Sequence, residues 1–245
     1  MKTETKEWFK EWFDTKYYHL LYNHRSNQEA ETFISNLATK LGIHKNARVW
    51  DLACGKGRHS LALNKLGFQV CGTDLSRESI QVARQFENET LSFFELDMRS
   101  PFRVNYFDVV MNLFTSFGYF NKKSDDLKVL QSVSNSLKQN GIFVFDYLNS
   151  KSIQIDQEQL VIVKDEVNFT ITKEKKDNAI IKHIQVNDRN EQFDFYESVK
   201  LYQPEEIIEL ANQVNLKKIN LFGDYELNTF DANKSPRMIF VFKKQ

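Results

Sequence analysis

Two glycines and an acidic residue in the segment VWDLACGKGRHS, residues 49–60, are the part of the sequence best suited to chemistry. Asp51 ends an apolar run, and Gly55 and Gly57 follow where the chain must turn. Glycine tolerates positive φ and has no Cβ that would obstruct a ligand beside the backbone. A helix that begins directly after such a turn points its free N–H groups and the positive end of its dipole at the same space. The segment therefore predicts a strand, a tight turn and a helix that together bind a nucleotide-like cofactor.

Two further acidic residues follow apolar runs, Asp74 after FQVCGT and Asp97 after LSFFEL. In open parallel sheets, ligands bind at the carboxyl ends of the strands, near the point where the strand order reverses. Asp74 lies 17 positions after Gly57, a spacing at which a carboxylate at a strand end can accept both ribose hydroxyls. These features also suit a nicotinamide dinucleotide, although Ser60 occupies the position of the third glycine in the dinucleotide-binding pattern.

The composition and charge are those of an ordinary globular protein. The 245 residues include 33 Lys and Arg and 33 Asp and Glu, so no overall basic field favours nucleic acid or an anionic membrane. The charged N-terminal segment lacks the apolar core of a signal peptide, and no apolar run approaches the length of a membrane span. Cys54 and Cys71 belong to no CxxC pair or Cys/His cluster. We therefore expect a cytoplasmic protein with neither structural disulfides nor a metal site.

Helix and strand patterns alternate through the first 150 residues. Near-continuous apolar strands that alternate with amphipathic helices indicate a parallel sheet covered on both faces. One of these helices carries Leu130, Val133 and Leu137 at helical spacing, and we expect it to end near Gly141. From about residue 161 to residue 200, alternating apolar and polar runs with DN and DRN turns predict an antiparallel meander. A helix that begins at Pro204 and two further strands return the chain to the α/β pattern.

Five segments in order resemble class I S-adenosylmethionine-dependent methyltransferases: DLACGKGRHS, GTDLS, ELDMRSPF, FDVVMNLFTSFGYF and LKQNGIFVFDYLN. The resemblance spans residues 47–149, and YESVKLYQPEEI and SPRMIFVFKK resemble one bacterial branch with a β insertion before the sixth strand. It implies a Rossmann-like, doubly wound seven-stranded sheet with the last strand antiparallel, plus a small antiparallel β insertion. The implied units are an N-terminal helical segment that closes over the cofactor (1–45), the methyltransferase domain (46–152 and 201–245) and the inserted meander (153–200).

The resemblance also implies that the cofactor is S-adenosylmethionine. The glycine turn would pack on its methionine and ribose portions, Asp74 would bind the ribose and Asp97 would face the adenine amino group. Ala53 stands where many members of the family have glycine, a small change that should preserve the turn. The expected cofactor-binding residues are Asp51, Ala53, Gly55, Gly57, Asp74, Leu75, Asp97, Met98, Asn112, Tyr18 and Arg25.

The chemistry expected at such a site is alignment of a nucleophile and exclusion of water. Aromatic side chains of NLFTSFGYF would form the walls of the acceptor pocket. Tyr119, Asp146 and Tyr147 are candidates to accept a proton, and no general base is assigned. We expect methyl transfer to a nitrogen or oxygen of a small molecule, with neither nucleic acid nor a membrane as partner and no prediction of the oligomeric state. An NAD(P)-dependent oxidoreductase, or a non-catalytic binding protein that retains the pocket, are the alternatives.

Overall fold

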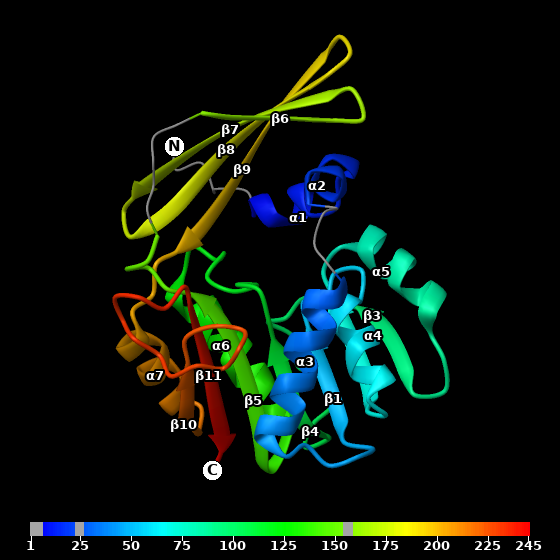
Figure 1. The fold of residues 1–245 in the computed structure, drawn as a ribbon, viewed down its shortest axis with the longest axis vertical. Helices are drawn as coiled ribbons and strands as arrows, with labels where there is room; N and C mark the ends of the chain where they lie inside the picture. Colours follow the sequence, from blue (N-terminus) through cyan, green and yellow to red (C-terminus); the bar gives the residue numbers. More distant parts are fainter. Residues whose placement is uncertain (1–6, 23–26, 154–158) are drawn as a thin grey trace.

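The computed structural model describes residues 7–22, 27–153 and 159–245, which form two β-sheets with helices around and between them (Figure 1). The strands of the larger sheet are β1 (Arg48–Leu52), β2 (Gln69–Asp74), β3 (Leu91–Glu95), β4 (Phe107–Asn112), β5 (Leu137–Leu148), β10 (Leu216–Phe222) and β11 (Arg237–Lys244). Their order is β10-β11-β5-β4-β1-β2-β3, and β11 runs antiparallel to both of its neighbours. The predicted doubly wound, seven-stranded sheet with an antiparallel last strand is confirmed.

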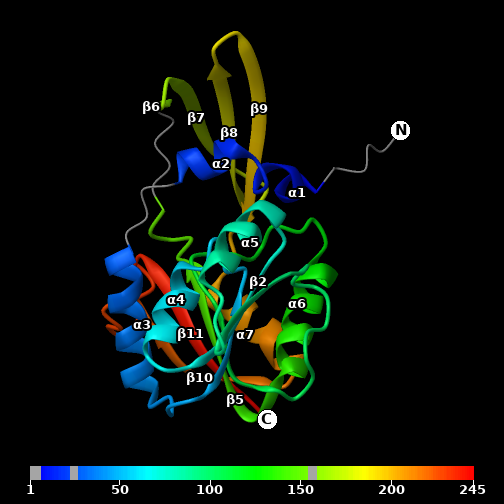
Figure 2. The same cartoon turned by 90° about the vertical axis from the view of Figure 1, so that its right-hand side faces the viewer.

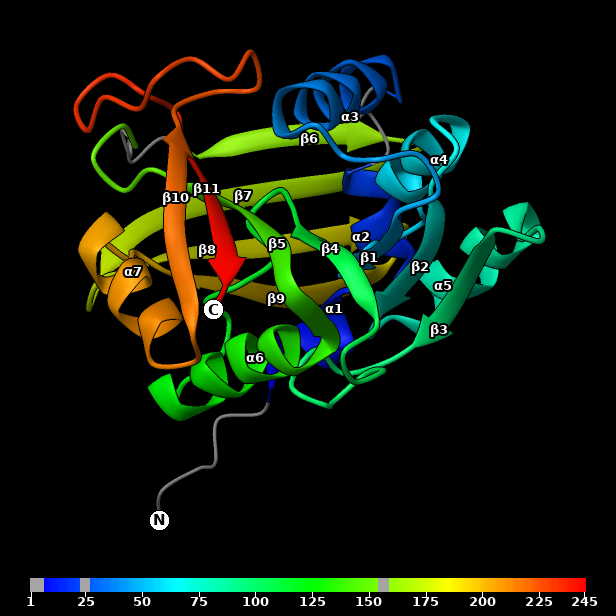
Figure 3. The same ribbon diagram turned by 90° about the horizontal axis from the view of Figure 1, so that it is seen from below.

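Helices cover both faces of this sheet (Figure 3). One face carries α3 (Asn27–Leu41), α4 (Arg58–Lys65) and α5 (Arg77–Ala83), which continues into a 3-10 turn (Arg84–Phe86); the other carries α6 (Lys123–Ser136) and α7 (Pro204–Asn212). Successive side chains of a strand point to opposite faces, so Val49 belongs to the core shared with α3 and α4, while Trp50 belongs to the core shared with α6 and α7. Within the described residues, none of the helices combines the length and the apolar character needed to cross a membrane.

The end of α6 differs from the prediction. The helix ends at Ser136 rather than near Gly141, and Leu137 has extended backbone angles and begins β5. Leu137 is fully buried and pairs with Phe107 of β4. Leu137 lies four positions after Val133, which is the spacing of a buried residue at the end of a helix. A buried leucine at the start of the next strand gives the same spacing, so the pattern alone does not distinguish the two.

The smaller sheet is antiparallel and consists of β6 (Leu160–Lys164), β7 (Val167–Lys176), β8 (Ala179–Asp188) and β9 (Glu191–Lys200), in that order. Two short helices, α1 (Trp8–Trp12) and α2 (Lys16–Leu21), lie between the two sheets (Figures 1 and 2). Trp12, Tyr17 and Leu21 pack on the smaller sheet with Phe169 and Ile184. The expected antiparallel β insertion is therefore present, and the N-terminal helices fill the space between it and the larger sheet.

Candidate active site

A cavity of about 310 Å³ opens at the carboxyl ends of β1, β2, β3 and β4. Its walls come from the loops after these strands, from the first turn of α4 and from the segment that forms α1 and α2. The residues predicted from the sequence that line the cavity are Tyr18, Ala53, Gly55, Asp74, Leu75, Asp97, Met98, Phe114, Tyr119 and Phe120. Phe117 of the same predicted wall is buried and does not line it. Parallel strands end at one edge of a sheet, which is why residues far apart in the sequence meet here.

Asp74 is a fixed acceptor in the cavity wall. The Gly55 N–H donates to its Oδ2 at 2.8 Å, and the Ser76 N–H donates to its Oδ1 at 2.8 Å. Burial raises the pKa of Asp74, and these backbone hydrogen bonds partly offset the effect. A carboxylate oxygen can accept more than one hydrogen bond, so both oxygens can still accept from a ligand hydroxyl.

The two glycines of the turn have different roles. Gly55 has φ +56°, and a Cβ placed on it would meet no atom within 4 Å, so the backbone opens onto space for a ligand. Gly57 has φ +84°, and a Cβ there would lie 2.8 Å from Cζ of Phe93. Gly57 therefore allows the turn to pack on β3 and does not line the cavity.

Asp51 lies behind the turn, with 1 % of its surface exposed, and does not line the cavity. The Ser60 hydroxyl donates to its Oδ2 at 2.5 Å. Burial raises the pKa of Asp51 to about 6, against the opposing effect of the Ser60 hydrogen bond. The serine at the third-glycine position thus supplies a donor to a buried carboxyl group.

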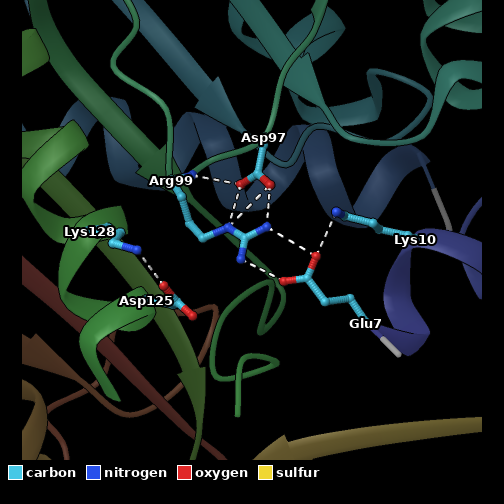
Figure 4. Close-up of polar contacts among 6 residues, drawn as sticks. All are labelled: Glu7, Lys10, Asp97, Arg99, Asp125 and Lys128. Carbon is cyan, nitrogen blue, oxygen red and sulfur yellow. Dashed lines mark hydrogen bonds and ion pairs between the residues drawn. The ribbon is translucent and has the colours of Figure 1, made fainter. Parts of the chain in front are cut away.

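Asp97 lines the cavity but is also held by Arg99, which the sequence analysis did not single out (Figure 4). Arg99 Nη2 donates to Asp97 Oδ2 at 2.6 Å, and its Nη1 donates to Glu7 Oε1 at 2.6 Å. Burial raises the pKa of Asp97, but the hydrogen bonds from Arg99 outweigh it and keep the pKa below its ordinary value. An arginine two residues after an acid at a strand end was the available signal.

Aromatic side chains from the N-terminal helices complete the cavity wall. Phe9 and Phe13, which the sequence analysis missed, line it together with Tyr18. The Phe13 ring lies 5.5 Å from that of Tyr119, and the Phe9 ring lies 5.3 Å from that of Phe120. Recurring aromatic residues in EWFKEWFDTKYYHLL were the signal in the sequence. Arg25, also predicted to bind the cofactor, falls outside the described residues.

Three predicted residues lie behind the cavity wall. Asn112 donates through Nδ2 to the Leu52 carbonyl at 3.0 Å. Asp146 is fully buried and paired with Arg237, whose Nε donates to Asp146 Oδ1 at 2.8 Å. Tyr147 donates to the Lys200 carbonyl at 2.6 Å, and burial raises its pKa well above the ordinary value. The structure therefore brings Tyr119 to the cavity but not Asp146 or Tyr147.

No group of three or more His, Cys, Asp or Glu side chains within residues 7–22, 27–153 and 159–245 is arranged to hold a metal ion. The polar groups of the cavity are instead carboxylates, hydroxyl and backbone groups, and the basic side chains of His19, Lys56, Arg58 and His59. A doubly wound sheet with this strand order, a glycine turn after β1 and acids after β2 and β3 define the class I methyltransferase fold.

Comparison with known proteins agrees with this class. The family model described as "Methyltransferase domain" matches residues 43–207, and the chain belongs to this family. The YqeM protein of Bacillus subtilis is 36 % identical over 114 residues, which cover 45 % of this chain and 46 % of YqeM. The glycine/sarcosine N-methyltransferase of Aphanothece halophytica is 35 % identical over 132 residues, 51 % of this chain and 48 % of the relative. The chain thus spans about half the length of these curated relatives.

Solved structures show the same fold over nearly the whole chain. An S-adenosylmethionine-dependent methyltransferase from Clostridium acetobutylicum is 22 % identical, with a TM-score of 0.77 over 93 % of this chain and 96 % of that chain. CalS10, an amino pentose methyltransferase from Micromonospora echinaspora solved with S-adenosylmethionine bound, is 18 % identical. Its TM-score is 0.70, over 94 % of this chain and 98 % of CalS10. The sugar N-methyltransferase KedS8 from Streptoalloteichus is 19 % identical, with a TM-score of 0.73 over 93 % of this chain and 92 % of KedS8.

Proposed function

We propose that this protein is an S-adenosylmethionine-dependent methyltransferase that acts on a nitrogen of a small molecule. The observation that carries the proposal is Asp74, a buried carboxylate held on the cavity wall by two backbone N–H groups, with lone pairs left for a vicinal diol. The relatives described as N-methyltransferases favour nitrogen over oxygen as the acceptor atom. The balanced charge of the chain and a cavity roofed by two helices favour a small acceptor over nucleic acid.

The cavity residues fit the chemistry of this cofactor. Asp74 would hold the ribose, and Asp97, Leu75 and Met98 would surround the adenine. The open space beside Gly55 would accommodate the methionine portion. The chemistry that bound S-adenosylmethionine supplies is an electrophilic methyl group with a neutral sulfide as leaving group.

The contribution of the chain itself is orientation and exclusion of water. The Tyr119 hydroxyl donates to the Thr115 carbonyl at 2.6 Å, and a phenolic oxygen that donates in this way can also accept a hydrogen bond from an amine N–H. The rings of Phe9 and Phe13 beside Tyr119 keep this region apolar. Correct alignment of a nucleophile alone can supply a large part of a rate enhancement. We therefore assign Tyr119 to orienting the amine, and Asp146 and Tyr147 to supporting the cavity wall from behind.

Calorimetry with S-adenosylhomocysteine, the demethylated product, tests the proposal. We expect the unmodified protein to bind it, and Asp74→Ala to bind it more weakly by about 1.5–3 kcal/mol because hydrogen bonds to a charged acceptor are lost. Asp194→Ala is the matched control, since Asp194 is 54 % exposed on β9 and outside the cavity. Absence of binding, or equal affinity in Asp74→Ala and Asp194→Ala, would refute the proposal.

A further inference from the structure

Two basic residues at the first turn of α4 line the cavity and share one aromatic platform. The Arg58 guanidinium carbon lies 4.7 Å from the centre of the Phe114 ring, and the His59 ring stacks on Phe114 at 5.0 Å. Arg58 Nη2 lies 3.5 Å from His59 Nε2. Both side chains belong to the cavity wall rather than to the solvated start of the helix.

Phe114, on which this pair stacks, lies across β1 from the acids proposed to hold the cofactor. Phe114 follows β4, which lies on one side of β1, whereas Asp74 ends β2 and Asp97 follows β3 on the other side. Across the described part of the chain, Asp74 and Asp97 are the only carboxylates that line the cavity. The part of the wall around Phe114 therefore presents Arg58 and His59 to a ligand, and neither carboxylate of the wall comes from the loop after β4.

The Phe114 platform is held by a buried ion pair. Phe114 and Thr115 have φ of +60° and +61°, a conformation that costs free energy for residues other than glycine. The Phe114 N–H donates to Asp146 Oδ2 at 2.8 Å, Arg237 Nε donates to Asp146 Oδ1 at 2.8 Å, and Arg237 Nη2 donates to the Thr115 hydroxyl at 2.8 Å. The Tyr225 ring also stacks on Phe114, at 5.1 Å. Asp146 and Arg237 are thus positioning residues for the ring on which Arg58 lies.

Arg58 has the chemistry to bind an anionic group of a ligand. Guanidinium presents a planar fork of donors that matches a carboxylate in a bidentate pair, and stacking on a ring fixes the plane of that fork. Its carboxylate partner Glu29 is 47 % exposed, with Oε2 3.9 Å from Arg58 Nη1. Arg58 is 15 % exposed, but its distance to the half-exposed Glu29 is near the limit of an ion pair, so a ligand carboxylate inside the cavity can compete with Glu29.

We propose that Arg58 and His59 bind a carboxylate of the methyl acceptor, which makes the substrate an amino acid rather than a neutral amine or an amino sugar. This inference rests on the proposed function and specifies its acceptor. The carboxylate binds over Phe114, and the amine is directed toward Tyr119 and the aromatic rings of α1 and its following turn. A cofactor carboxylate is the competing occupant, and the experiment separates the two.

The experiment uses pairs of amines that differ only in a carboxylate: glycine and methylamine, sarcosine and dimethylamine, β-alanine and ethylamine. Formation of S-adenosylhomocysteine is measured with the unmodified protein, with Arg58→Gln and with Arg103→Gln. Arg103 is the matched control because it is an exposed arginine near the Tyr106 ring, at 4.7 Å, and lies outside the cavity. We expect kcat/KM to favour the carboxylate-bearing member, and Arg58→Gln to reduce that preference by about 10- to 100-fold through KM. Arg103→Gln should retain it.

Binding of S-adenosylhomocysteine to the same variants identifies the competing case. An unchanged Kd in Arg58→Gln supports the acceptor subsite, whereas a Kd raised 10-fold or more assigns Arg58 to the cofactor carboxylate and overturns the proposal. If none of the amines is methylated, thermal unfolding of the S-adenosylhomocysteine complex with the same pairs decides. A rise in Tm with the amino acids that is absent in Arg58→Gln supports the subsite. Equal changes in Tm within each pair, or no change, overturn it. In that event S-adenosylhomocysteine binding still stands as evidence for the proposed function.

Discussion

Gly57 and Gly67 share a left-handed backbone conformation but have different surroundings. A Cβ on Gly57 would meet the buried Phe93 ring at 2.8 Å, whereas a Cβ on Gly67 would meet no atom within 4 Å. We expect Gly67→Ala to lower the free energy of unfolding by about 1–2 kcal/mol through backbone strain alone. Gly57→Ala should lower the free energy of unfolding by about 1–3 kcal/mol more than Gly67→Ala does, because Phe93 is buried and cannot move aside freely. Urea unfolding of both variants checks this, and equal losses would contradict it.

The buried Asp51 should make stability depend on pH. Its pKa rises to about 6 in the folded protein from an ordinary value of 3.8, so between these values the folded state binds the additional proton. The stabilising contribution is therefore present at low pH and is lost as the pH rises through about 6.

The variant Asp51→Asn tests this dependence, because an asparagine side chain does not titrate. The free energy of unfolding of the variant, relative to that of the unmodified protein, should therefore rise by up to about 3 kcal/mol between pH 4 and pH 7. Urea unfolding of both proteins at unit intervals of pH measures this difference. A difference that stays constant over the range would show that Asp51 does not carry the raised pKa.

At the scale of elements, one buried carboxylate joins the N-terminal helices to the smaller sheet. Glu197 of β9 accepts hydrogen bonds at Oε1 from Trp12 Nε1 and from the Tyr22 hydroxyl, both at 2.8 Å. Lys182 of β8 donates to its Oε2 at 2.7 Å. Burial raises the pKa of Glu197, but Lys182 and these hydrogen bonds outweigh it and lower the pKa. The carboxylate is thus charged where α1 and α2 meet the sheet.

Loss of this charge should loosen the roof of the cavity without unfolding the larger sheet. In Glu197→Gln, we expect faster amide hydrogen exchange in residues 8–21. The free energy of local opening should be lower by about 1–3 kcal/mol, because charged hydrogen bonds are replaced by neutral ones. Exchange in β1 and β4 should not change. Lys16→Ala is the control, since Lys16 is 70 % exposed and an exposed ion pair such as that with Asp188 contributes little to stability. Equal exchange in Glu197→Gln and Lys16→Ala would contradict this role.

The elements could be predicted where the evidence was local. Asp74 ends an apolar run, and the glycine turn precedes an amphipathic helix, so each pattern lies within a few residues. The contact of Trp12 with Glu197 spans 185 positions in the sequence and forms only when the smaller sheet packs against the N-terminal helices. No local pattern encodes such a contact. The same holds for Glu7 and Arg99, which pair across 92 positions.

At the scale of the whole molecule, a ligand in the cavity should stabilise both the larger sheet and the N-terminal helices that enclose it. We expect S-adenosylhomocysteine at 100 times its Kd to raise stability by about 2.7 kcal/mol, which corresponds to about 5–10 °C in Tm for a chain of this size. NAD and NADP at equal concentration should leave Tm unchanged. A shift by either nucleotide without one by S-adenosylhomocysteine would favour the oxidoreductase alternative.

The site divides into a part that the sequence predicts and a part that it does not. Ala53, Gly55, Asp74 and Asp97 line the cavity as expected, because the ends of parallel strands share one edge of the sheet. Phe9 comes from an element whose position depends on packing between the two sheets, and hydrophobic patterning alone does not give that position.

The long-range contacts of α1 and α2 also have a consequence for synthesis of the chain. Proteins leave the ribosome from the N-terminus, so Trp12 and Tyr17 emerge well before their partners on β8 and β9. Until β9 has been translated, Trp12 lacks the Glu197 carboxylate and the Phe195 ring, and Tyr17 lacks the Phe193 ring, so both side chains have only part of the surface on which they pack. A nascent chain halted before that point would carry an exposed aromatic segment of the kind that chaperones engage. Translation past β9 is therefore the step that allows the first helices to reach their native place.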